Sequence, residues 1–308
     1  MRLTRRQTLI AGAALPLVAA MPFSFMLPRA ADAQGMAAAP ISRDFALGDF
    51  RVTTLLAGSF PGNANPQEIF GLNVTPEEFA AVAAANFVPA DRTQGYFTPT
   101  VVNTGSEVIL FDTGIDAVGV TAALAAAGYF PGDVTHVVLT HMHPDHIGGL
   151  TGEDGAATFA NATYITGRAE FDFWTGAANQ GFDAKVRPLA ERMTFLDDGG
   201  TVRSGITAVA AYGHSPGHMT YMLDSGGQQM LILADTANHH VFSLAYPDWD
   251  VRFDADKPAA AATRRRLLGM AAADRFAVIG YHLPFPGAGF VENRGEGFHY
   301  VPASYQFG

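Results

Sequence analysis

Short apolar runs separated by turn residues are the main pattern along the chain, and they predict β-strands. The runs form two groups, one before and one after residue 200. We expect strands at 51–57, 100–104, 107–111 and 135–140 in the first group, and at 206–210, 219–223, 229–233 and 276–279 in the second. Shorter strand and helix units alternate up to about residue 196. The segment 60–73 is rich in Gly, Pro and Asn and is predicted to be a loop.

Three longer segments have helical signals. Thr75-Pro76-Glu77-Glu78 is a capping box with proline at the first helical position, so a helix should extend to about Ala85. Further helices are predicted at 117–127 and, in an Ala-rich stretch, at 256–273. Because helices follow each group of strands, we predict an α/β protein with two mixed sheets packed face to face and helices outside.

The N-terminal segment has the pattern of an export signal. Arg2, Arg5 and Arg6 precede an apolar run at 9–27, and Ala31-Asp32-Ala33 supplies the small residues of a cleavage site. The string Thr4-Arg5-Arg6-Gln7-Thr8-Leu9 resembles a twin-arginine signal, which directs export of a folded protein.

We therefore expect residues 1–33 to be a signal peptide, 34–44 a linker and 45–308 a single domain, located in the periplasm or secreted. After cleavage we expect no stable insertion into a membrane. An uncleaved membrane anchor is the alternative, which the prolines of the apolar run disfavour.

Composition restricts the chemistry that the chain can perform. It has 308 residues and no cysteine, so disulfides, thiolate ligands and a cysteine nucleophile are excluded, and a transition metal would need His and carboxylate ligands. Without residues 1–33 the formal net charge changes from −10 to −13, which disfavours a nucleic-acid partner. The one basic cluster, Arg264-Arg265-Arg266, is interpreted as a solvated helix face.

Four candidate metal ligands lie within six residues in His141-Met142-His143-Pro144-Asp145-His146. In an extended segment His141 and His143 point the same way, and Pro144 then turns the chain so that Asp145 and His146 face a neighbouring point. Imidazole and carboxylate suit zinc, and also manganese, cobalt or iron. The segment predicts a site for two adjacent metal ions rather than a merely polar loop.

This string resembles the signature of the metallo-β-lactamase superfamily of hydrolases, and three later segments match its further motifs in order. They are Gly213-His214-Ser215-Pro216-Gly217-His218, Leu233-Ala234-Asp235-Thr236 and Tyr281-His282-Leu283-Pro284-Phe285-Pro286. The resemblance implies an αββα sandwich with two divalent metal ions, zinc above all, at one edge between the sheets.

The resemblance also implies the role of each matching residue. It assigns one metal ion to His141, His143 and His218, the other to Asp145, His146 and His282, and a bridging position to Asp235. On this reading His214 shapes the turn and Asp112 supports the ligands. For His239 and His240, a structural role and a place near the substrate remain equally open.

Such a cluster predicts hydrolysis without a protein nucleophile. Two divalent ions, two carboxylates and a bridging hydroxide leave roughly one net positive charge, which can stabilise an anion that develops on the substrate. Metal ions also lower the pKa of bound water to near 7. We expect the metal-bridging hydroxide to attack, with Asp235 holding the metals and Asp145 accepting a proton.

Within the superfamily the chain is most similar to the branch that contains methyl parathion hydrolase and quorum-quenching lactonases. The similarity lies in segments 171–174, 246–249, 252–256, 282–287 and 297–302. In that branch aromatic residues form a substrate wall, so Trp174, Phe97 and Phe285 are predicted to contact the substrate. The relatives also suggest a homodimer.

We therefore expect a hydrolase that cleaves a small, neutral, hydrophobic lactone or ester, with phosphotriesterase activity in addition. A dedicated organophosphate triesterase of the methyl parathion type is the first alternative. A non-catalytic zinc-binding protein and a sulfur dioxygenase with one iron are the others. A loop near 114–117, shorter than in methyl parathion hydrolase, disfavours organophosphate as the main substrate.

Overall fold

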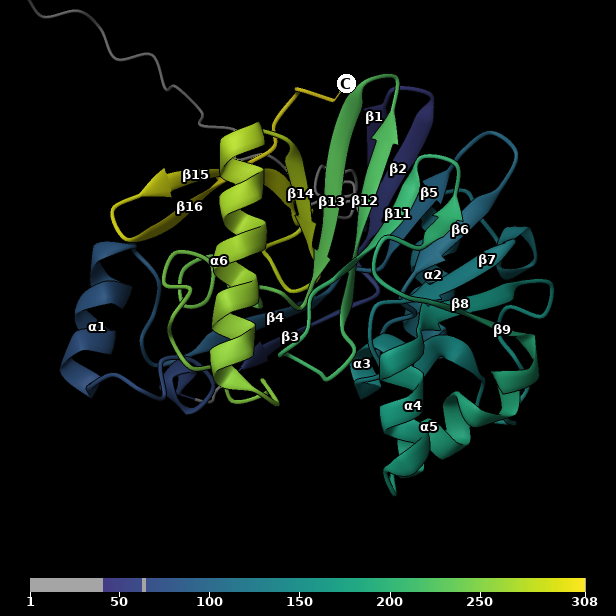
Figure 1. The fold of residues 1–308 in the computed structure, drawn as a ribbon, viewed down its shortest axis with the longest axis horizontal. Coiled ribbons are helices and arrows are strands. Elements are labelled where there is room, and N and C mark those ends of the chain that lie inside the picture. Colours follow the sequence, from purple (N-terminus) through teal and green to yellow (C-terminus); the bar gives the residue numbers. More distant parts are fainter. Residues whose placement is uncertain (1–40, 63–64, 308) are drawn as a thin grey trace, which may run out of the picture. The chain divides into compact units, whose positions relative to one another are not determined.

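The computed structural model describes residues 41–62 and 65–307 (Figure 1). The predicted signal peptide lies outside these residues, as does most of the predicted linker. Strand β1 (Ser42–Leu47) begins at Ser42, so the last three residues predicted as linker, 42–44, belong to a strand instead. Within the described ranges, no helix combines the length and apolarity needed to cross a membrane.

The described residues form two large sheets and one small one. The first sheet has the spatial order β1, β2 (Phe50–Leu55), β5 (Thr100–Asn103), β6 (Val108–Phe111), β7 (His136–Leu139), β8 (Thr163–Gly167), β9 (Met193–Leu196). The second has the order β10 (Thr201–Arg203), β11 (Ile206–Ala210), β12 (Met219–Ser225), β13 (Gln228–Ala234), β14 (Ala277–Gly280), β15 (Ala288–Arg294), β16 (Gly297–Pro302). β3 (Gly58–Gly62) and β4 (Thr93–Phe97) pair separately. Both large sheets are mixed, since β6 to β9 run parallel and so do β13 and β14.

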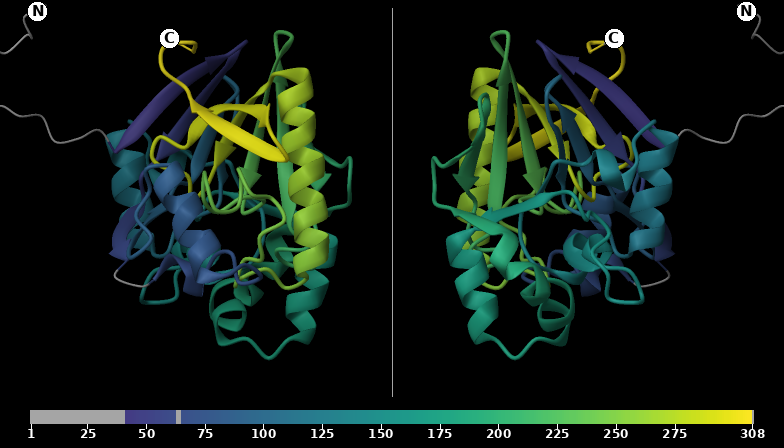
Figure 2. Two further views of the ribbon diagram at one scale, coloured as in Figure 1. Left: turned by 90° about the vertical axis from the view of Figure 1, so that its left-hand side faces the viewer. Right: turned by 90° about the vertical axis from the view of Figure 1, so that its right-hand side faces the viewer.

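Helices cover the outer face of each large sheet (Figures 1 and 2). The α-helices of the described chain are α1 (Pro76–Ala85), α2 (Ala117–Ala126), α3 (Pro144–Ile147), α4 (Arg168–Gly176), α5 (Gln180–Lys185) and α6 (Lys257–Asp274). Helix α6 lies on the second sheet, and α2, α4 and α5 lie on the side of the first. The predicted αββα arrangement is therefore confirmed.

Three apolar cores separate these layers. Side chains alternate along a strand, so each sheet can bury both of its faces. On β7, Val137 packs in the core that contains Leu124 of α2, whereas its neighbour Val138 packs between the two sheets with Ile232 of β13. The core beneath α6 contains Leu267 and belongs to the second sheet. Strands buried on both faces explain the long apolar runs of the sequence.

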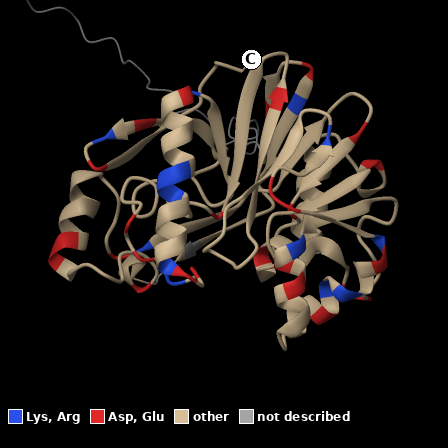
Figure 3. Ribbon diagram, in the orientation of Figure 1, with Lys and Arg blue, Asp and Glu red and all other residues tan. Residues whose placement is uncertain are grey.

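The arginine cluster of α6 differs from its predicted role. Figure 3 marks this basic band in the middle of the helix. Arg265 is exposed and pairs with Asp248, as a solvated residue would. Arg264, in contrast, is only 1% exposed and donates to Asp254 and to two backbone carbonyls. The interpretation as a solvated face is therefore wrong for Arg264, because its side chain crosses the interior instead of pointing to water.

Candidate metal centre

The candidate ligands gather where strands of both sheets end. His141 follows β7, Asp235 follows β13 and His282 follows β14. These strands belong to parallel pairs, and the loops at the carboxyl ends of parallel strands meet at the same edge of a sheet. The face-to-face packing of the sheets then brings the two loop sets together. The fold therefore assembles one site from segments as far apart in sequence as His141 and His282.

Three histidines form the first group. His141 Nε2 lies 3.0 Å from His143 Nδ1, and the same nitrogen of His143 lies 3.0 Å from His214 Nε2. One ligand atom from each residue lies within 4.8 Å of the other two. Three imidazole nitrogens that converge in this way could hold a metal ion such as zinc.

Asp145, His146 and His282 form the second group, with the same mutual limit of 4.8 Å. His282 Nε2 lies 3.3 Å from Asp145 Oδ2, and His146 Nε2 lies 3.7 Å from it. Pro144 begins the short helix α3, which turns Asp145 and His146 away from the extended His141–His143 segment. The turn predicted at Pro144 is confirmed.

Asp235 stands between the two groups. Its Oδ1 lies 3.2 Å from His146 Nε2, and its Oδ2 lies 3.3 Å from His214 Nε2 and 3.2 Å from His282 Nε2. The preceding residue, Ala234, has a φ of 45°, a left-handed backbone conformation that residues other than glycine rarely adopt. This kink at the end of β13 aims the carboxylate at both groups, which is the geometry that a bridging ligand needs.

The carboxylates of the cluster are poised to stay ionised. Burial opposes the charge on Asp235, but the fields of His282 and His146 outweigh it and hold the pKa of Asp235 well below its ordinary value. Burial also opposes the charge on Asp145, yet His146 and His282 lower its pKa to about 2. At neutral pH both side chains are therefore negative, and the site attracts cations.

The histidines of the cluster differ in pKa according to the charged groups beside them. Burial, together with the charge of His214, lowers the pKa of His143 to about 4. Burial also opposes a positive charge on His214 and His282. The nearby carboxylates outweigh this effect of burial and raise the pKa of His214 to about 9 and that of His282 to about 10. These protons balance the carboxylates and would leave when a metal ion takes their place.

Two observations indicate that the residues of the cluster could hold a pair of divalent ions. His146 Nε2 and Asp235 Oδ1 are buried and lie 3.2 Å apart, yet neither forms a well-oriented hydrogen bond with the other or with another described residue, although unsatisfied buried polar atoms are costly. Both atoms face the cluster, where a metal ion would satisfy them. The donor set of imidazoles and carboxylates, without sulfur, is also one that zinc, manganese, cobalt and iron accept.

Asp112 supports the cluster from behind, as the sequence predicted. Its carboxylate accepts hydrogen bonds from the backbone N–H and the hydroxyl of Thr140, at 2.9 and 2.8 Å, and its Oδ2 lies 2.8 Å from His146 Nδ1. Asp112 has a left-handed φ of 59°. Such strain at the end of β6 persists because the surrounding bonds hold the residue in place. A carboxylate on the far nitrogen orients His146 toward the metal site.

The structure differs from the prediction at His218. Its Nδ1 lies 3.1 Å from the carbonyl oxygen of Ala211, and its Nε2 accepts the backbone N–H of Asp235 at 3.2 Å. Both ring nitrogens are therefore engaged with the backbone. His214, predicted only to shape the turn, is the residue that the structure brings to His143, while its Nδ1 lies 3.0 Å from Asp254 Oδ1.

Glycines allow the Gly213–His218 turn to approach its neighbours. A Cβ on Gly213, whose φ is 125°, would come within 2.2 Å of the backbone nitrogen of Ala260 in α6. A Cβ on Gly217 would come within 2.0 Å of the backbone nitrogen of Glu170 in α4. Only glycine fits either position, so the motif is wedged between two helices and His214 is aimed at the cluster.

Substituting the two histidines of this motif separately should distinguish their roles. We expect His214→Asn to weaken binding of one metal ion by more than about 100-fold, because a ligand is lost and loss of a ligand's outer partner alone already costs about 10- to 100-fold. We expect His218→Asn to keep the metal content and to lower the free energy of unfolding by about 1–3 kcal/mol, because buried backbone groups lose partners. Metal content by atomic emission and urea unfolding measure the two effects. The reverse pattern would restore His218 as the ligand.

The predicted substrate residues are only partly brought to the site. Phe97 lines a cavity of about 460 Å³ that opens on the cluster. Trp174 and Phe285 do not line it. Trp174 donates its indole N–H to Glu170 at 2.7 Å and packs against the core beneath the first sheet. Its predicted substrate contact is therefore not supported, because the indole is held by a buried carboxylate, although its ring centroid lies 6.0 Å from that of His143.

Glu170 is a site-building residue that sequence reasoning missed. It is fully buried, and its carboxylate accepts hydrogen bonds from the backbone N–H groups of Met142 and Gly217 and from the hydroxyl of Ser215. It thereby ties the His141–His146 loop to the Gly213–His218 loop. No sequence signal distinguishes Glu170 from Arg168 and Asp172, the other charged residues of the same short helix.

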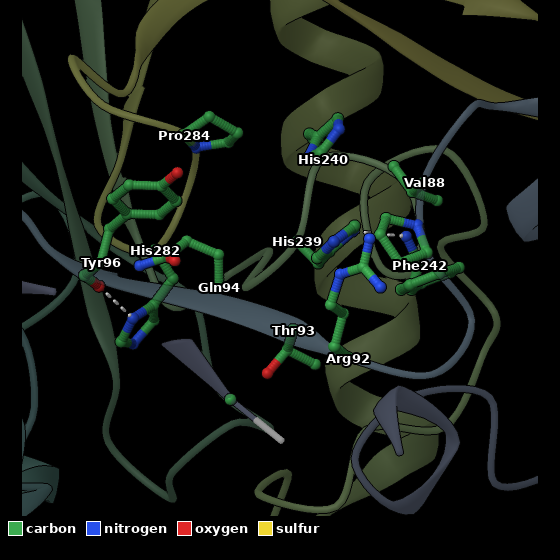
Figure 4. Close-up of a pocket in the computed structure, with 12 residues that line it drawn as sticks. Val88, Arg92, Thr93, Gln94, Tyr96, His239, His240, Phe242, His282 and Pro284 are labelled. Atoms are coloured by element: carbon green, nitrogen blue, oxygen red, sulfur yellow. Dashed lines mark hydrogen bonds between the residues drawn. The ribbon is translucent and has the colours of Figure 1, made fainter. Parts of the chain in front are cut away.

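The cavity beside the cluster is mainly apolar. Its wall includes six hydrophobic side chains, Phe60, Ile69, Phe70, Phe97, Ile115 and Phe253. Asp145, Asp235, His143, His214 and His282 line its floor. A second cavity of about 390 Å³ lies next to it, and the two share Thr93, Gln94, His239 and His282 (Figure 4).

Comparison with solved structures supports the fold over most of the chain. AidC, described as a dizinc quorum-quenching lactonase in complex with a product, matches with a TM-score of 0.78 and 25% identity over 87% of this chain and 100% of its own. AbOPH, described as a hydrolase in the beta lactamase superfamily, matches with a TM-score of 0.80 and 24% identity over 88% of this chain and all of its own.

Curated relatives match a shorter region. An N-acyl homoserine lactonase, AttM of Azorhizobium caulinodans, is 33% identical over 119 residues, or 34% of this chain and 41% of the relative. The thioesterase pkgB of Emericella nidulans is 30% identical over 149 residues, which cover 47% of this chain and 37% of the relative. The matched region thus spans less than half the length of these relatives.

The family model of the metallo-beta-lactamase superfamily matches residues 98–280. This range contains three of the four motifs, and the fourth motif begins directly after it at Tyr281. With more than half of the chain matched and the fold shared, this enzyme belongs to the metallo-beta-lactamase superfamily.

Proposed function

We propose that this enzyme is a dinuclear metal-dependent hydrolase that opens neutral, hydrophobic lactones, N-acyl homoserine lactones above all. One observation carries the proposal: a single cavity is walled by apolar side chains and floored by five members of the His/Asp cluster. An apolar wall favours a neutral substrate with a hydrocarbon part, and the cluster supplies the polar end. The names of AttM and AidC support the lactone as substrate class.

In this proposal one metal ion would be held by His141, His143 and His214, and the other by Asp145, His146 and His282, with Asp235 between them. When bound, such ions lower the pKa of water and polarise a carbonyl oxygen. The residues themselves set the geometry, because Asp112 orients His146 and Asp254 orients His214.

The reaction needs a group that moves one proton. Water adds to the lactone carbonyl carbon, the ring carbon–oxygen bond breaks, and the proton lost by water ends on the released alkoxide. Asp145 is placed to carry it, because its side chain is 24% exposed and lines the cavity, and its low pKa leaves it ionised. The hydroxyl of Tyr281 donates to the backbone carbonyl of Asp145 at 2.5 Å and holds that residue in position.

We also propose that the enzyme acts outside the cytoplasm. The support is the twin-arginine-like string and the cleavage-site pattern within residues 1–33. The absence of cysteine is compatible with an oxidising compartment.

A substrate panel tests the proposed activity. Metal-loaded protein would be assayed with N-hexanoyl-homoserine lactone, an aryl lactone, an aryl ester and methyl paraoxon. We expect the homoserine lactone to give the highest kcat/KM, about 10⁴ M⁻¹ s⁻¹ or more, as for an ordinary enzyme with its substrate. Chelator-treated protein is the control. A higher kcat/KM for methyl paraoxon would favour a phosphotriesterase, and no turnover above the control would contradict hydrolysis of all four substrates.

A further inference from the structure

The ring of His239 is held with one nitrogen facing the protein and the other facing the cavities. Its Nδ1 accepts the backbone N–H groups of Val241 and Phe242, at 3.0 and 3.1 Å. A ring nitrogen that accepts hydrogen bonds carries no hydrogen, so the neutral ring must carry its hydrogen on Nε2. Burial, with His240 close by, lowers the pKa of His239 well below its ordinary value, which keeps the ring neutral.

Aromatic packing fixes the position of this ring. It stacks on Phe242 with the centroids 4.5 Å apart and on His240 with the centroids 4.6 Å apart. Phe242 is in turn stacked on Phe79 of α1. The hydroxyl of Ser243 bonds to both the N–H and the carbonyl of His239. The donor on Nε2 is therefore pre-organised and cannot turn away, which limits the entropy lost when it binds a ligand.

His239 lies where the two cavities meet. It lines both of them, and in Figure 4 it stands across the second cavity from His282. Its Nε2 forms no hydrogen bond to any residue in the described parts of the chain. The neighbouring amide Asn238, by contrast, already donates to Asp235 at 2.8 Å. A bound molecule that reaches past the cluster would therefore meet a fixed, unengaged N–H group beside Phe70.

We propose that His239 determines substrate specificity, donating its Nε2–H to a carbonyl oxygen that lies outside the reacting ring. The chemical class that fits is a lactone bearing an acyl amide, with the ring at the cluster, the amide carbonyl at His239 and the hydrocarbon chain along the apolar wall. This inference rests on the proposed function. It adds that an amide-bearing lactone is selected over an alkyl lactone of equal length, because only the former offers the acceptor.

A comparison of two substrates in four proteins tests this assignment. N-hexanoyl-homoserine lactone and an alkyl γ-lactone of similar length are assayed with wild type, His239→Phe, His239→Gln and His240→Phe. We expect His239→Phe to lower kcat/KM for the amide-bearing lactone about tenfold, the size of one hydrogen bond, and mainly through KM. The alkyl lactone should change by less than about twofold, since it makes no such bond.

The other two variants are matched controls. Glutamine can accept from the backbone and still donate to the substrate, so His239→Gln should keep most of the selectivity. His240 lines only the second cavity, so His240→Phe should leave the ratio of the two lactones unchanged. If His239→Phe does not fold, His239→Glu replaces it, because glutamate accepts from the backbone but has no donor when ionised.

The outcomes separate the two proposals. If wild type hydrolyses neither lactone, the proposed function fails and the inference fails with it. If wild type hydrolyses both and the His239 variants change the two lactones by the same factor, only the inference is overturned. Equal loss of selectivity in His240→Phe would also overturn it, since the effect would then belong to the whole segment.

Discussion

Replacing Asp235 by alanine should remove at least one metal ion per chain and lower lactone hydrolysis by roughly a thousandfold or more, the order expected when a transition-state contact is lost. The reason is the position of its carboxylate, with Oδ1 3.2 Å from His146 and Oδ2 within 3.3 Å of His214 and His282. No other carboxylate among the described residues contacts both groups of candidate ligands. Without it, no carboxylate would lie between the two cations to offset their mutual repulsion.

Metal content by atomic emission and kcat/KM on the same protein preparation would measure this effect. Asp224→Ala is the matched control, because Asp224 is exposed and its carboxylate accepts only from Gln229. We expect the control to keep its metal and its activity. Full activity of Asp235→Ala with a full metal complement would refute the bridging role. Full metal with lost activity would assign Asp235 to the reaction rather than to metal binding.

The local part of the site could be predicted from sequence. His141 to His146 lie on one short segment, so strand alternation and one proline suffice to place them. The choice between His214 and His218 could not be made in this way. Both histidines lie in one glycine-bounded turn, and the one that reaches the cluster is decided by Asp254, forty residues later, and by the carbonyl of Ala211.

The substrate wall was hard to predict for a related reason. Trp174 follows a site loop and is aromatic, which is typical of a substrate contact, but the buried Glu170 one helical turn earlier takes its N–H. Phe97 reaches the cavity because β4 pairs with β3, and neither strand was predicted. A segment that contains Gly58, Pro61 and Gly62 has low strand propensity, and it is extended only because a partner strand is present.

The fold was predicted where strands are buried on both faces. The apolar runs of β6, β7, β12 and β13 give strong signals, and these elements were found close to their observed bounds. Strands at the sheet edges were missed, among them β1 and β16, because only one face is buried and charged or polar residues interrupt the pattern. Their pairing is decided by contacts distant in sequence, such as the register between β15 and β16.

Replacing Arg264 by methionine should lower the free energy of unfolding by about 3–5 kcal/mol, which is the cost of leaving one partner of a buried ion pair without its counter-charge. Arg264 donates to Asp254 Oδ2 at 2.8 Å and to the carbonyls of Pro247 and Trp249. Asp254 is itself buried, so its charge would lose its strongest partner. Because Asp254 also orients His214, metal affinity should fall about tenfold.

Urea unfolding of metal-free protein and competition with a chelator would measure the two effects of Arg264→Met separately. Arg265→Met is the matched control on the same helix, since its pair with Asp248 is exposed and worth less than about 1 kcal/mol. The double variant Asp254→Asn, Arg264→Met should cost less than the sum of the single variants, because it leaves no unpaired charge. A loss in Arg264→Met no larger than that in Arg265→Met would contradict the argument that a buried arginine holds the metal centre in shape. Unchanged metal affinity in a destabilised Arg264→Met would limit its role to folding.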